Sequence, residues 1–152
     1  MEHIKETVEQ IFTKYLKERS LRQTPERLAI LDKIYSIAGH FDIEQLYVFM
    51  QGSNYPVSRA TLYNTIDLLV DCNLVTKHQF GKNNLSIFEK VIDKNIHHHS
   101  VCTVCGKIGK FADANIKLAV QSKKIKNFNI SHYSLYVYGI CGKCKKGKTV
   151  KK

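Results

Sequence analysis

The stretch SRATLYNTIDLLVDC, residues 58–72, has the pattern of an amphipathic helix and decides how the first half of the chain folds. Ser58 is suited to cap the N-terminus of this helix, because its hydroxyl can accept a hydrogen bond from a backbone N–H of the first turn. Apolar residues recur every three or four positions and form the face that we expect to be buried, namely Leu62, Ile66, Leu69 and Val70. Arg59 and Tyr63 stand one turn apart on the other face, with Asn64 beside them.

Three amphipathic segments precede this helix. The first covers residues 4–16, and Thr24 followed by Pro25 marks the start of the second, with Gly39 at its end. The apolar face of the second segment is expected to comprise Leu28, Leu31, Ile34 and Ala38. Asp42 is suited to cap the third helix, whose apolar face is expected to comprise Ile43, Leu46, Tyr47 and Met50.

The sequence GSNYP at residues 52–56 predicts a tight turn before the last of these helices. Short helices, a turn and a further helix with an exposed polar start are typical of a helix-turn-helix, which places that start in the major groove of DNA. The candidate DNA-contacting residues are Arg59, Thr61, Tyr63 and Asn64. Such helices also occur in proteins that bind no DNA, so simple packing is the alternative. Strand patterns at 74–80 and 85–91, with GKNN between them, predict the hairpin of a winged helix.

Composition and charge limit the class of protein and of partner. The chain has 152 residues, of which 43% are hydrophobic, and no apolar run of about 18 residues that could span a membrane. Its start lacks the apolar core of a signal peptide, so we expect a cytoplasmic protein whose five cysteines are reduced. The net charge of +11 favours a polyanion, either nucleic acid or an anionic membrane surface. The basic tail 145–152 has no aliphatic anchor, which makes the membrane surface the weaker alternative.

Four of the cysteines form two matching pairs with the spacing of zinc knuckles. Two residues separate Cys102 from Cys105 and Cys141 from Cys144, and glycine follows or splits each pair. Four thiolates make a closed tetrahedral zinc site, which has no open position for chemistry. Four unrelated buried cysteines are the alternative, and a buried position is the role that we expect for Cys72. The surrounding elements predicted from the pattern are strands at 97–102, 107–111 and 132–141 and a helix at 114–127.

Three consecutive histidines precede the first cysteine pair. In an extended strand alternate side chains face opposite sides, so His97 and His99 share one face while Cys102 lies on the other. This parity favours two metal sites over one. Glu89 and His40 are candidates to join the two histidines, and such a mixed nitrogen and oxygen set suits Fe(II), Mn(II) or Zn(II). An exposed histidine-rich strand that binds nothing is the alternative.

The chain resembles the ferric uptake regulator family over residues 18–144. The stretches that carry the resemblance are LRQTPERLAILDKI, RATLYNTIDLL, FEK, HHHSVCTVCGKIGKF and SLYVYGICGKC. The family implies a homodimeric, metal-dependent repressor that binds double-stranded operator DNA. It also implies an α+β fold, with an N-terminal winged helix-turn-helix domain at 1–90, a hinge at about 80–95, and a small α/β dimerisation domain with a structural zinc site at 96–144.

The resemblance also assigns two metal sites by position. The structural Zn²⁺ falls on Cys102, Cys105, Cys141 and Cys144. The regulatory ion, expected to be Fe²⁺ or Mn²⁺ with Zn²⁺ as a substitute, falls on His40, Glu89, His97 and His99. Only the resemblance implies that His40 lies close to the other three, because spacing alone does not bring it near them.

Two features depart from the family pattern. Family members often have an acidic residue that completes the regulatory site where this chain has Lys110, a poor ligand whose charge opposes a bound cation. Some members have an additional metal site, whose positions here are Ile96, His98, Lys117 and Tyr133. Most of these side chains are poor ligands, so we expect no such site, and we expect His98 at the surface or beside a ligand.

The regulatory residues favour the iron- and peroxide-responsive branch of the family. Zinc sensors usually have a cysteine in this site, whereas the residues implied here are histidines and a carboxylate. Asn64 after Tyr63 also resembles the peroxide-sensing members. The expected function is repression of metal-uptake or oxidative-stress genes in response to Fe(II) or Mn(II), with peroxide as a second candidate signal. The alternatives are a zinc-responsive regulator of this family and a zinc-stabilised DNA-binding protein whose switch is disabled by Lys110.

A zinc enzyme is the alternative from another class, with His97, His99 and Glu89 binding a catalytic ion. No HExxH-type arrangement supplies a general base, and no nucleophile motif appears, so we expect no enzyme.

Overall fold

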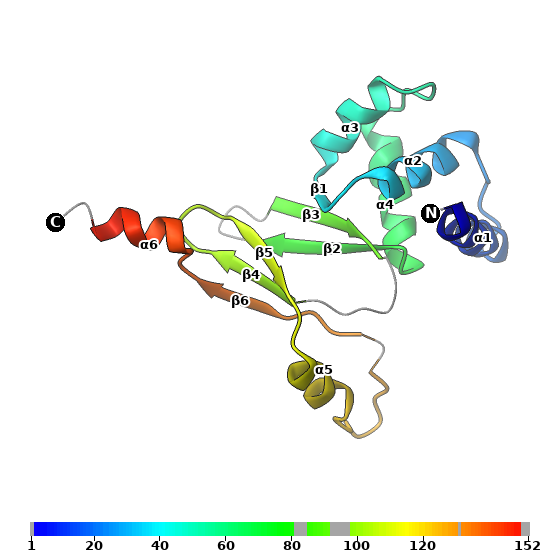
Figure 1. Ribbon diagram of the computed structural model, residues 1–152. Helices are drawn as coiled ribbons and strands as arrows, with labels where there is room; N and C mark the ends of the chain where they lie inside the picture. The colour runs from blue at the N-terminus through cyan, green and yellow to red at the C-terminus, as the bar shows by residue number, and fades with distance from the viewer. Residues whose placement is uncertain (1, 81–84, 92–97, 131, 150–152) are drawn as a thin grey trace. The chain divides into compact units, whose positions relative to one another are not determined.

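The chain divides into two compact units (Figure 1). The computed structural model describes residues 2–80, 85–91, 98–130 and 132–149. The first unit comprises Met1–Gln79 with Leu85–Ile92, and the second comprises Phe80–Asn84 with Asp93–Lys152. None of the helices among the described residues combines the length and the apolar character that a membrane span requires.

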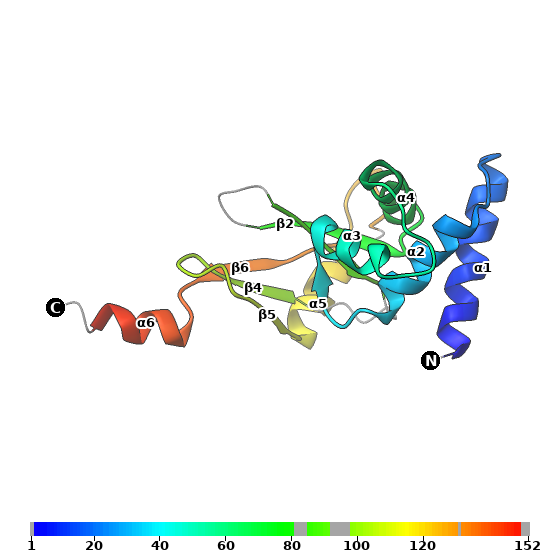
Figure 2. The ribbon, with the colours of Figure 1, turned by 90° about the horizontal axis from the view of Figure 1, so that it is seen from above.

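The first unit contains four helices that lie against one another (Figure 2). They are α1 (Glu2–Glu18), α2 (Pro25–Ser36), α3 (Ile43–Gln51) and α4 (Arg59–Asp71). The predicted caps are confirmed, because Thr24, Asp42 and Ser58 each accept a hydrogen bond from a backbone N–H of the following turn. At α3 the cap is reciprocal, since the side-chain oxygen of Gln45 also accepts a hydrogen bond from the backbone N–H of Asp42.

One hydrophobic core holds these helices together. Its largest fully buried side chains include Phe12, Leu16, Ile30, Ile34, Phe41, Leu46, Met50, Leu62, Ile66 and Leu69. Each such burial contributes roughly 1.5–3 kcal/mol, so tertiary packing rather than helix propensity stabilises these short helices. Cys72, which was expected to be buried, packs against this core but is only half-buried. One expectation for α2 was wrong: the helix ends at Ser36, before Ala38, and Gly39 adopts a φ of 77°.

A small three-stranded sheet completes the first unit. It contains β1 (His40–Phe41), β2 (Val75–Phe80) and β3 (Leu85–Lys90), with β3 in the middle. Both strands of the expected wing are present, and the hairpin expected at 81–84 lies outside the described residues. β1 was not predicted from the sequence; it pairs antiparallel with β3 and places Phe41 opposite Phe88, with ring centroids 5.9 Å apart.

Two side chains attach β3 to the end of α2. The Lys90 ammonium donates to the carbonyl oxygens of Tyr35 at 3.0 Å and Ile37 at 2.7 Å. A cation is favourable there, because the last carbonyl groups of a helix have no partner within the helix and carry partial negative charge. The Tyr35 hydroxyl lies 2.9 Å from the backbone oxygen of Leu74, which precedes β2, and 3.0 Å from that of Val91, which follows β3.

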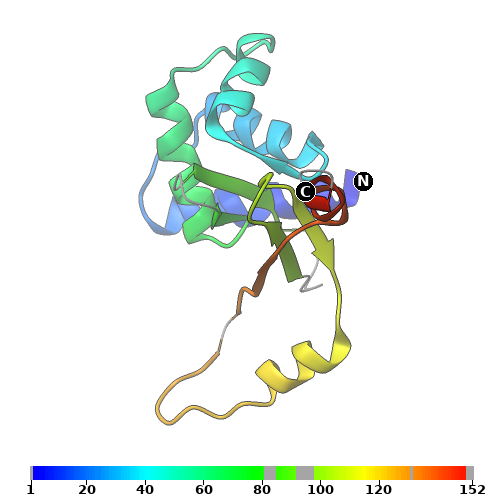
Figure 3. The same cartoon turned by 90° about the vertical axis from the view of Figure 1, so that its left-hand side faces the viewer.

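The second unit is a three-stranded sheet with two helices (Figure 3). Its elements are β4 (His98–Cys102), β5 (Ile108–Phe111), α5 (Ala114–Gln121), β6 (Tyr136–Gly139) and α6 (Gly142–Thr149). β4 is the central strand, antiparallel to β5 and parallel to β6. The predicted fold class, an α+β protein that begins with a winged helix-turn-helix, is confirmed.

Two segments of the second unit differ from expectation. The helix expected over 114–127 ends at Gln121, and Asn127 has a φ of 58° that a continued helix would not allow. α5 buries none of its residues, so tertiary contacts add little to stabilise a longer helix. Residues up to Thr149, which were expected to belong to a basic tail, continue α6.

Candidate metal centres and nucleic-acid interface

The four paired cysteines come together in the second unit. Cys102 ends β4, Cys141 directly precedes α6, and the sulfur atoms of these two and of Cys105 and Cys144 all lie within 4.8 Å of one another. The sulfurs of Cys105 and Cys141 are 3.8 Å apart. Four thiolates at ~2.3 Å from a tetrahedral zinc ion are separated by about 3.8 Å, so the spacing fits zinc.

The surrounding backbone prepares these sulfurs for a cation. The N–H of Cys141 donates to the Cys102 sulfur at 3.3 Å. The backbone of Cys105, Cys141 and Val104 lowers the pKa of Cys102 to about 6, because donated hydrogen bonds favour the thiolate. The pKa of Cys144 is raised to about 12, since its thiol donates to the sulfurs of Cys141 and Cys105. A divalent ion would take the place of that shared proton.

A second group of candidate ligands lies in the sheet of the first unit. The β1–β3 register places His40 opposite Glu89, and the two side chains approach to 3.3 Å between Nε2 and Oε2. His78 of β2 also places its Nε2 3.3 Å from the same carboxylate oxygen. Glu89 and His78 are buried, and His40 is nearly so. Two imidazoles around a buried carboxylate can provide two nitrogen ligands and one oxygen ligand to a metal ion.

Sequence reasoning missed His78. It lies in the predicted strand 74–80, between the exposed residues Lys77 and Gln79, so strand alternation marks it as an inward-facing polar residue. That pattern was a usable signal for burial. It could not identify the partner of His78, because this depends on β3 being the neighbouring strand.

The other two expected regulatory ligands belong to the part of the sequence that follows the wing. His97 lies outside the described residues. His99 is buried in β4 of the second unit, with its ring centroid 5.9 Å from that of Tyr136. Lys110, where the family often has an acidic residue, is the register partner of His99 on β5.

His98 was expected at the surface or beside a ligand, and a surface position is wrong. Its side chain is fully buried, and Nε2 lies 2.8 Å from the hydroxyl of Tyr133. The rings of Phe111 and Tyr133 pack beside it, with centroids 5.2 and 5.7 Å away. These two rings come from elsewhere in the sequence, and their packing against the imidazole accounts for its burial. Of the other positions of the additional site, Ile96 lies outside the described residues and Lys117 belongs to α5.

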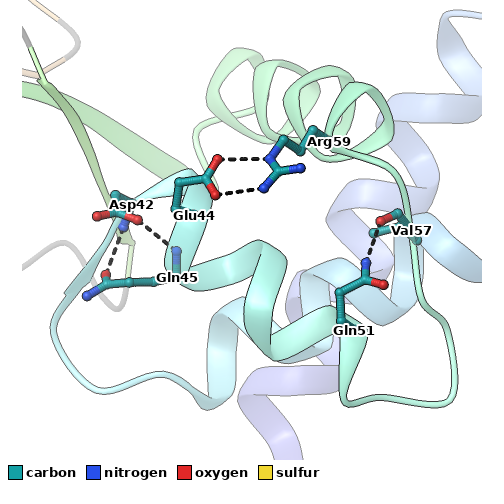
Figure 4. A network of polar contacts seen from close by, with 6 residues as sticks. All are labelled: Asp42, Glu44, Gln45, Gln51, Val57 and Arg59. Carbon is teal, nitrogen blue, oxygen red and sulfur yellow. Dashed lines mark hydrogen bonds and ion pairs between the residues drawn. The ribbon is translucent and has the colours of Figure 1, made fainter.

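The candidate DNA-contacting residues occupy the first turns of α4. Tyr63 is 52% exposed and Asn64 is also exposed, while Thr61 is half-buried with its hydroxyl 3.0 Å from that of Ser58. Arg59 donates two hydrogen bonds to Glu44 of α3, which lower the pKa of Glu44 and raise that of Arg59 (Figure 4). A shallow groove runs beside these turns, and its lining includes Arg22, Thr24, Arg27, Thr61 and Asn64.

Known proteins resemble this chain over most of its length. The family model described as the ferric uptake regulator family matches residues 18–138. The peroxide operon regulator of Bacillus subtilis is 32% identical over 132 residues, covering 86% of this chain and 89% of that protein. The ferric uptake regulation protein of Bordetella parapertussis is 32% identical over 135 residues, covering 88% and 96%. The solved structure of a ferric uptake regulator from Pseudomonas aeruginosa with manganese has a TM-score of 0.72 at 25% identity, covering 86% and 97%. These matches confirm the resemblance that the motifs indicated.

Proposed function

We propose that this chain, which belongs to the ferric uptake regulator family, is a metal-dependent transcriptional repressor that responds to Fe(II) or Mn(II). The observation that carries the proposal is the buried Glu89 carboxylate in the wing, with the imidazoles of His40 and His78 each at 3.3 Å. A buried carboxylate is costly unless a positive charge accompanies it, and a divalent cation provides that charge. His40, His78 and Glu89 all belong to the first unit, which also contains the proposed helix-turn-helix.

The donor atoms decide which ion suits each cluster. The four sulfurs of Cys102, Cys105, Cys141 and Cys144 suit Zn²⁺, which would be structural because no coordination position is left open. The nitrogen and oxygen donors around Glu89 suit Fe²⁺ or Mn²⁺, with Zn²⁺ as a substitute. The binding of a structural zinc would add folding free energy to the second unit.

We further propose that His97 and His99 complete the regulatory set with His40 and Glu89, following the family pattern. His78 adds a nitrogen donor that compensates for the missing acidic ligand at Lys110. Ligands drawn from both units would favour one arrangement of the DNA-binding units in a dimer. A preference of about 3 kcal/mol for the competent arrangement changes operator occupancy by ~100-fold.

The partner that we propose is double-stranded operator DNA. The net charge of +11 supplies salt-sensitive attraction to phosphates, and the groove beside α4 contributes Arg22 and Arg27. Arg59, Thr61, Tyr63 and Asn64 are the residues that we assign to the major groove. DNA as the partner places the protein in the cytoplasm, and the proposal assigns no catalytic residue.

A second copy of the chain is the other proposed partner. Within the part of the chain that the structure describes, β6 lies at the edge of its sheet, and a sheet edge is a place where a strand of another chain can pair. Apolar side chains that are exposed on the second unit include Leu118, Ile125, Phe128, Val137, Tyr138 and Ile140. Burying such a set between two copies would give the homodimer an apolar interface.

Anaerobic fluorescence anisotropy with a two-fold AT-rich duplex tests the proposed function. The zinc-loaded protein is titrated with no further metal, with Mn(II), with Fe(II) and with Zn(II). We expect tight binding with Mn(II) or Fe(II), and its loss in Glu89→Gln and in a His97→Ala/His99→Ala variant. Equal binding under all conditions would contradict the regulatory role and favour a zinc-stabilised protein without a switch. Peroxide is then added to the Fe(II) and Mn(II) samples, and release from the Fe(II) sample alone would assign peroxide as a signal.

A further inference from the structure

Two residues of α3 hold Arg59, and the contact with one of them, Glu44, is drawn in Figure 4. Its Nε donates to Oε1 of Glu44 and its Nη2 donates to Oε2, both at 2.9 Å. The centre of the guanidinium also lies 3.9 Å from the ring centroid of Tyr47. Glu44 and Tyr47 are three residues apart and so share one face of α3. The planar group is thus fixed along one edge by a carboxylate and across one face by an aromatic ring.

Stability alone does not account for this arrangement. Arg59 is the first residue of α4, where the helix dipole disfavours a cation, and the first turn of α4 contains no acidic residue. Glu44 supplies the missing negative charge from the neighbouring helix. However, the Arg59 and Glu44 side chains are 53% and 65% exposed, and exposed ion pairs contribute little to folding. Because neither the helix dipole nor the exposed ion pair favours an arginine at this position, its presence is better explained by a hydrogen-bond acceptor on a binding partner.

The geometry determines which part of Arg59 can meet that acceptor. A guanidinium has five N–H donors in a fixed plane, and Glu44 engages one from Nε and one from Nη2. The three remaining N–H groups, one on Nη2 and two on Nη1, point away from Glu44 along the other edges of the guanidinium. A pair of such donors matches two acceptors in one plane, such as O6 and N7 of guanine in the major groove. The Glu44 charge balances that of Arg59, so the pair attracts phosphates less than a lone arginine would.

We propose that Glu44 and Tyr47 are positioning residues, which aim Arg59 at a specific acceptor on DNA and restrain it from binding phosphates along any duplex. The inference rests on the proposed DNA-binding function. Selectivity for sequence would then depend on a residue of α3 that itself touches no base. Loss of Glu44 should release Arg59 as an additional mobile cation, which raises binding to unrelated DNA and weakens discrimination.

The test compares a selected duplex with a shuffled one. The full-length, metal-loaded wild type first enriches a duplex from a random pool, and affinities for this duplex and a shuffled copy are then measured across a salt series. For Glu44→Gln we expect the ratio of the two affinities to fall by about tenfold, the value of one lost bidentate contact. On the shuffled duplex, the slope of log affinity against log salt should become more negative by about 0.9, the value of one added phosphate contact.

Companion variants separate positioning from other roles. Arg59→Gln should lower the affinity ratio as much as Glu44→Gln does, and adding Glu44→Gln to Arg59→Gln should change the ratio little further. Tyr47→Leu should also lower the ratio, with the charge of the pair unchanged. Asp32→Asn is the matched control, because it removes the same charge from an exposed ion pair of the same unit, Lys5–Asp32 at 2.8 Å, and should leave the ratio unchanged.

Three results would overturn the inference. An unchanged ratio in Glu44→Gln, with or without a lower melting temperature, would mean that the pair only joins α3 to α4. Equal gains in affinity for both duplexes would mean that Glu44 merely repels DNA. A wild type that enriches no sequence would overturn the proposed function, and this inference with it, whereas the first two results leave the proposed function intact.

Discussion

Removing zinc from the four-cysteine cluster is expected to unfold the second unit and to leave the first unit folded. Among the described residues, nearly all buried apolar side chains belong to the first unit, and only Val101 and Cys102 belong to the second. These two burials contribute together on the order of 5 kcal/mol. Structural zinc contributes about 10–16 kcal/mol in small zinc domains. The metal is therefore the larger source of stability for the second unit.

Cys105→Ser is the most direct perturbation, because Cys105 is exposed and its replacement removes a ligand without opening a cavity in a core. Hydrogen exchange followed by mass spectrometry would compare this variant with the wild type, before and after chelation in reducing buffer. Amides of β4, β5 and β6 should lose their protection, while those of α2 and α4 should retain it. Cys72→Ser is the matched control, since Cys72 lies outside the cluster and should leave zinc content and protection of the second unit unchanged.

Two outcomes would refute this reasoning. If metal analysis shows that zinc is gone and β4 and β6 stay protected, then apolar contacts and sheet hydrogen bonds suffice to fold the second unit. If both units lose protection together, the first unit needs the second in order to stay folded. This would contradict the inference that its own hydrophobic core is sufficient.

Three further predictions concern other parts of the molecule. His78→Ala should raise the Mn(II) concentration needed for DNA binding at least about tenfold. Gln79→Ala, at the exposed neighbouring position, is the control and should leave that concentration unchanged. If His78→Ala and the wild type need the same Mn(II) concentration, His78 is not a ligand. Leu118→Asp should yield a monomer in light scattering, while Val48→Asp, at a similarly exposed position of α3, should leave the oligomeric state unchanged. Burial raises the pKa of Tyr35, so the contribution of its neutral hydroxyl is fully present below the ordinary pKa of about 10 and is lost as the pH rises towards the higher folded value. Tyr35→Phe should lower the free energy of unfolding by about 1 kcal/mol at neutral pH and weaken its alkaline decline, as urea titrations at several pH values would show.

Features determined by neighbouring residues could be predicted from the sequence. Thr24, Asp42 and Ser58 cap their helices through bonds that reach only three residues along the chain. The two cysteine pairs were recognisable for the same reason, since each knuckle is a local motif. Prediction of α4 succeeded because its buried face repeats over several turns.

Features determined by distant contacts were not predictable in this way. β1 has only two residues, which is too short for any periodicity, and its pairing with β3 is what places His40 beside Glu89. His78 was missed because its partner lies on another strand. The burial of His98 depends on the rings of Phe111 and Tyr133, which come from other parts of the sequence, and the early end of α5 follows from the absence of a packed face. None of these is encoded within a short window of sequence.

Two consecutive residues of β3 contact different parts of the first unit, and this constrains how the protein can be re-engineered. Glu89 faces His40 and His78, whereas Lys90 faces the other way and binds the carbonyl groups at the end of α2. A chimera that takes β3 from a relative without a lysine at position 90 would therefore lose the two hydrogen bonds to the end of α2, even if all the metal ligands were kept. The proposed ligands His40, His78 and Glu89 come from β1, β2 and β3, so an exchange of metal specificity between relatives must transfer these three strands together.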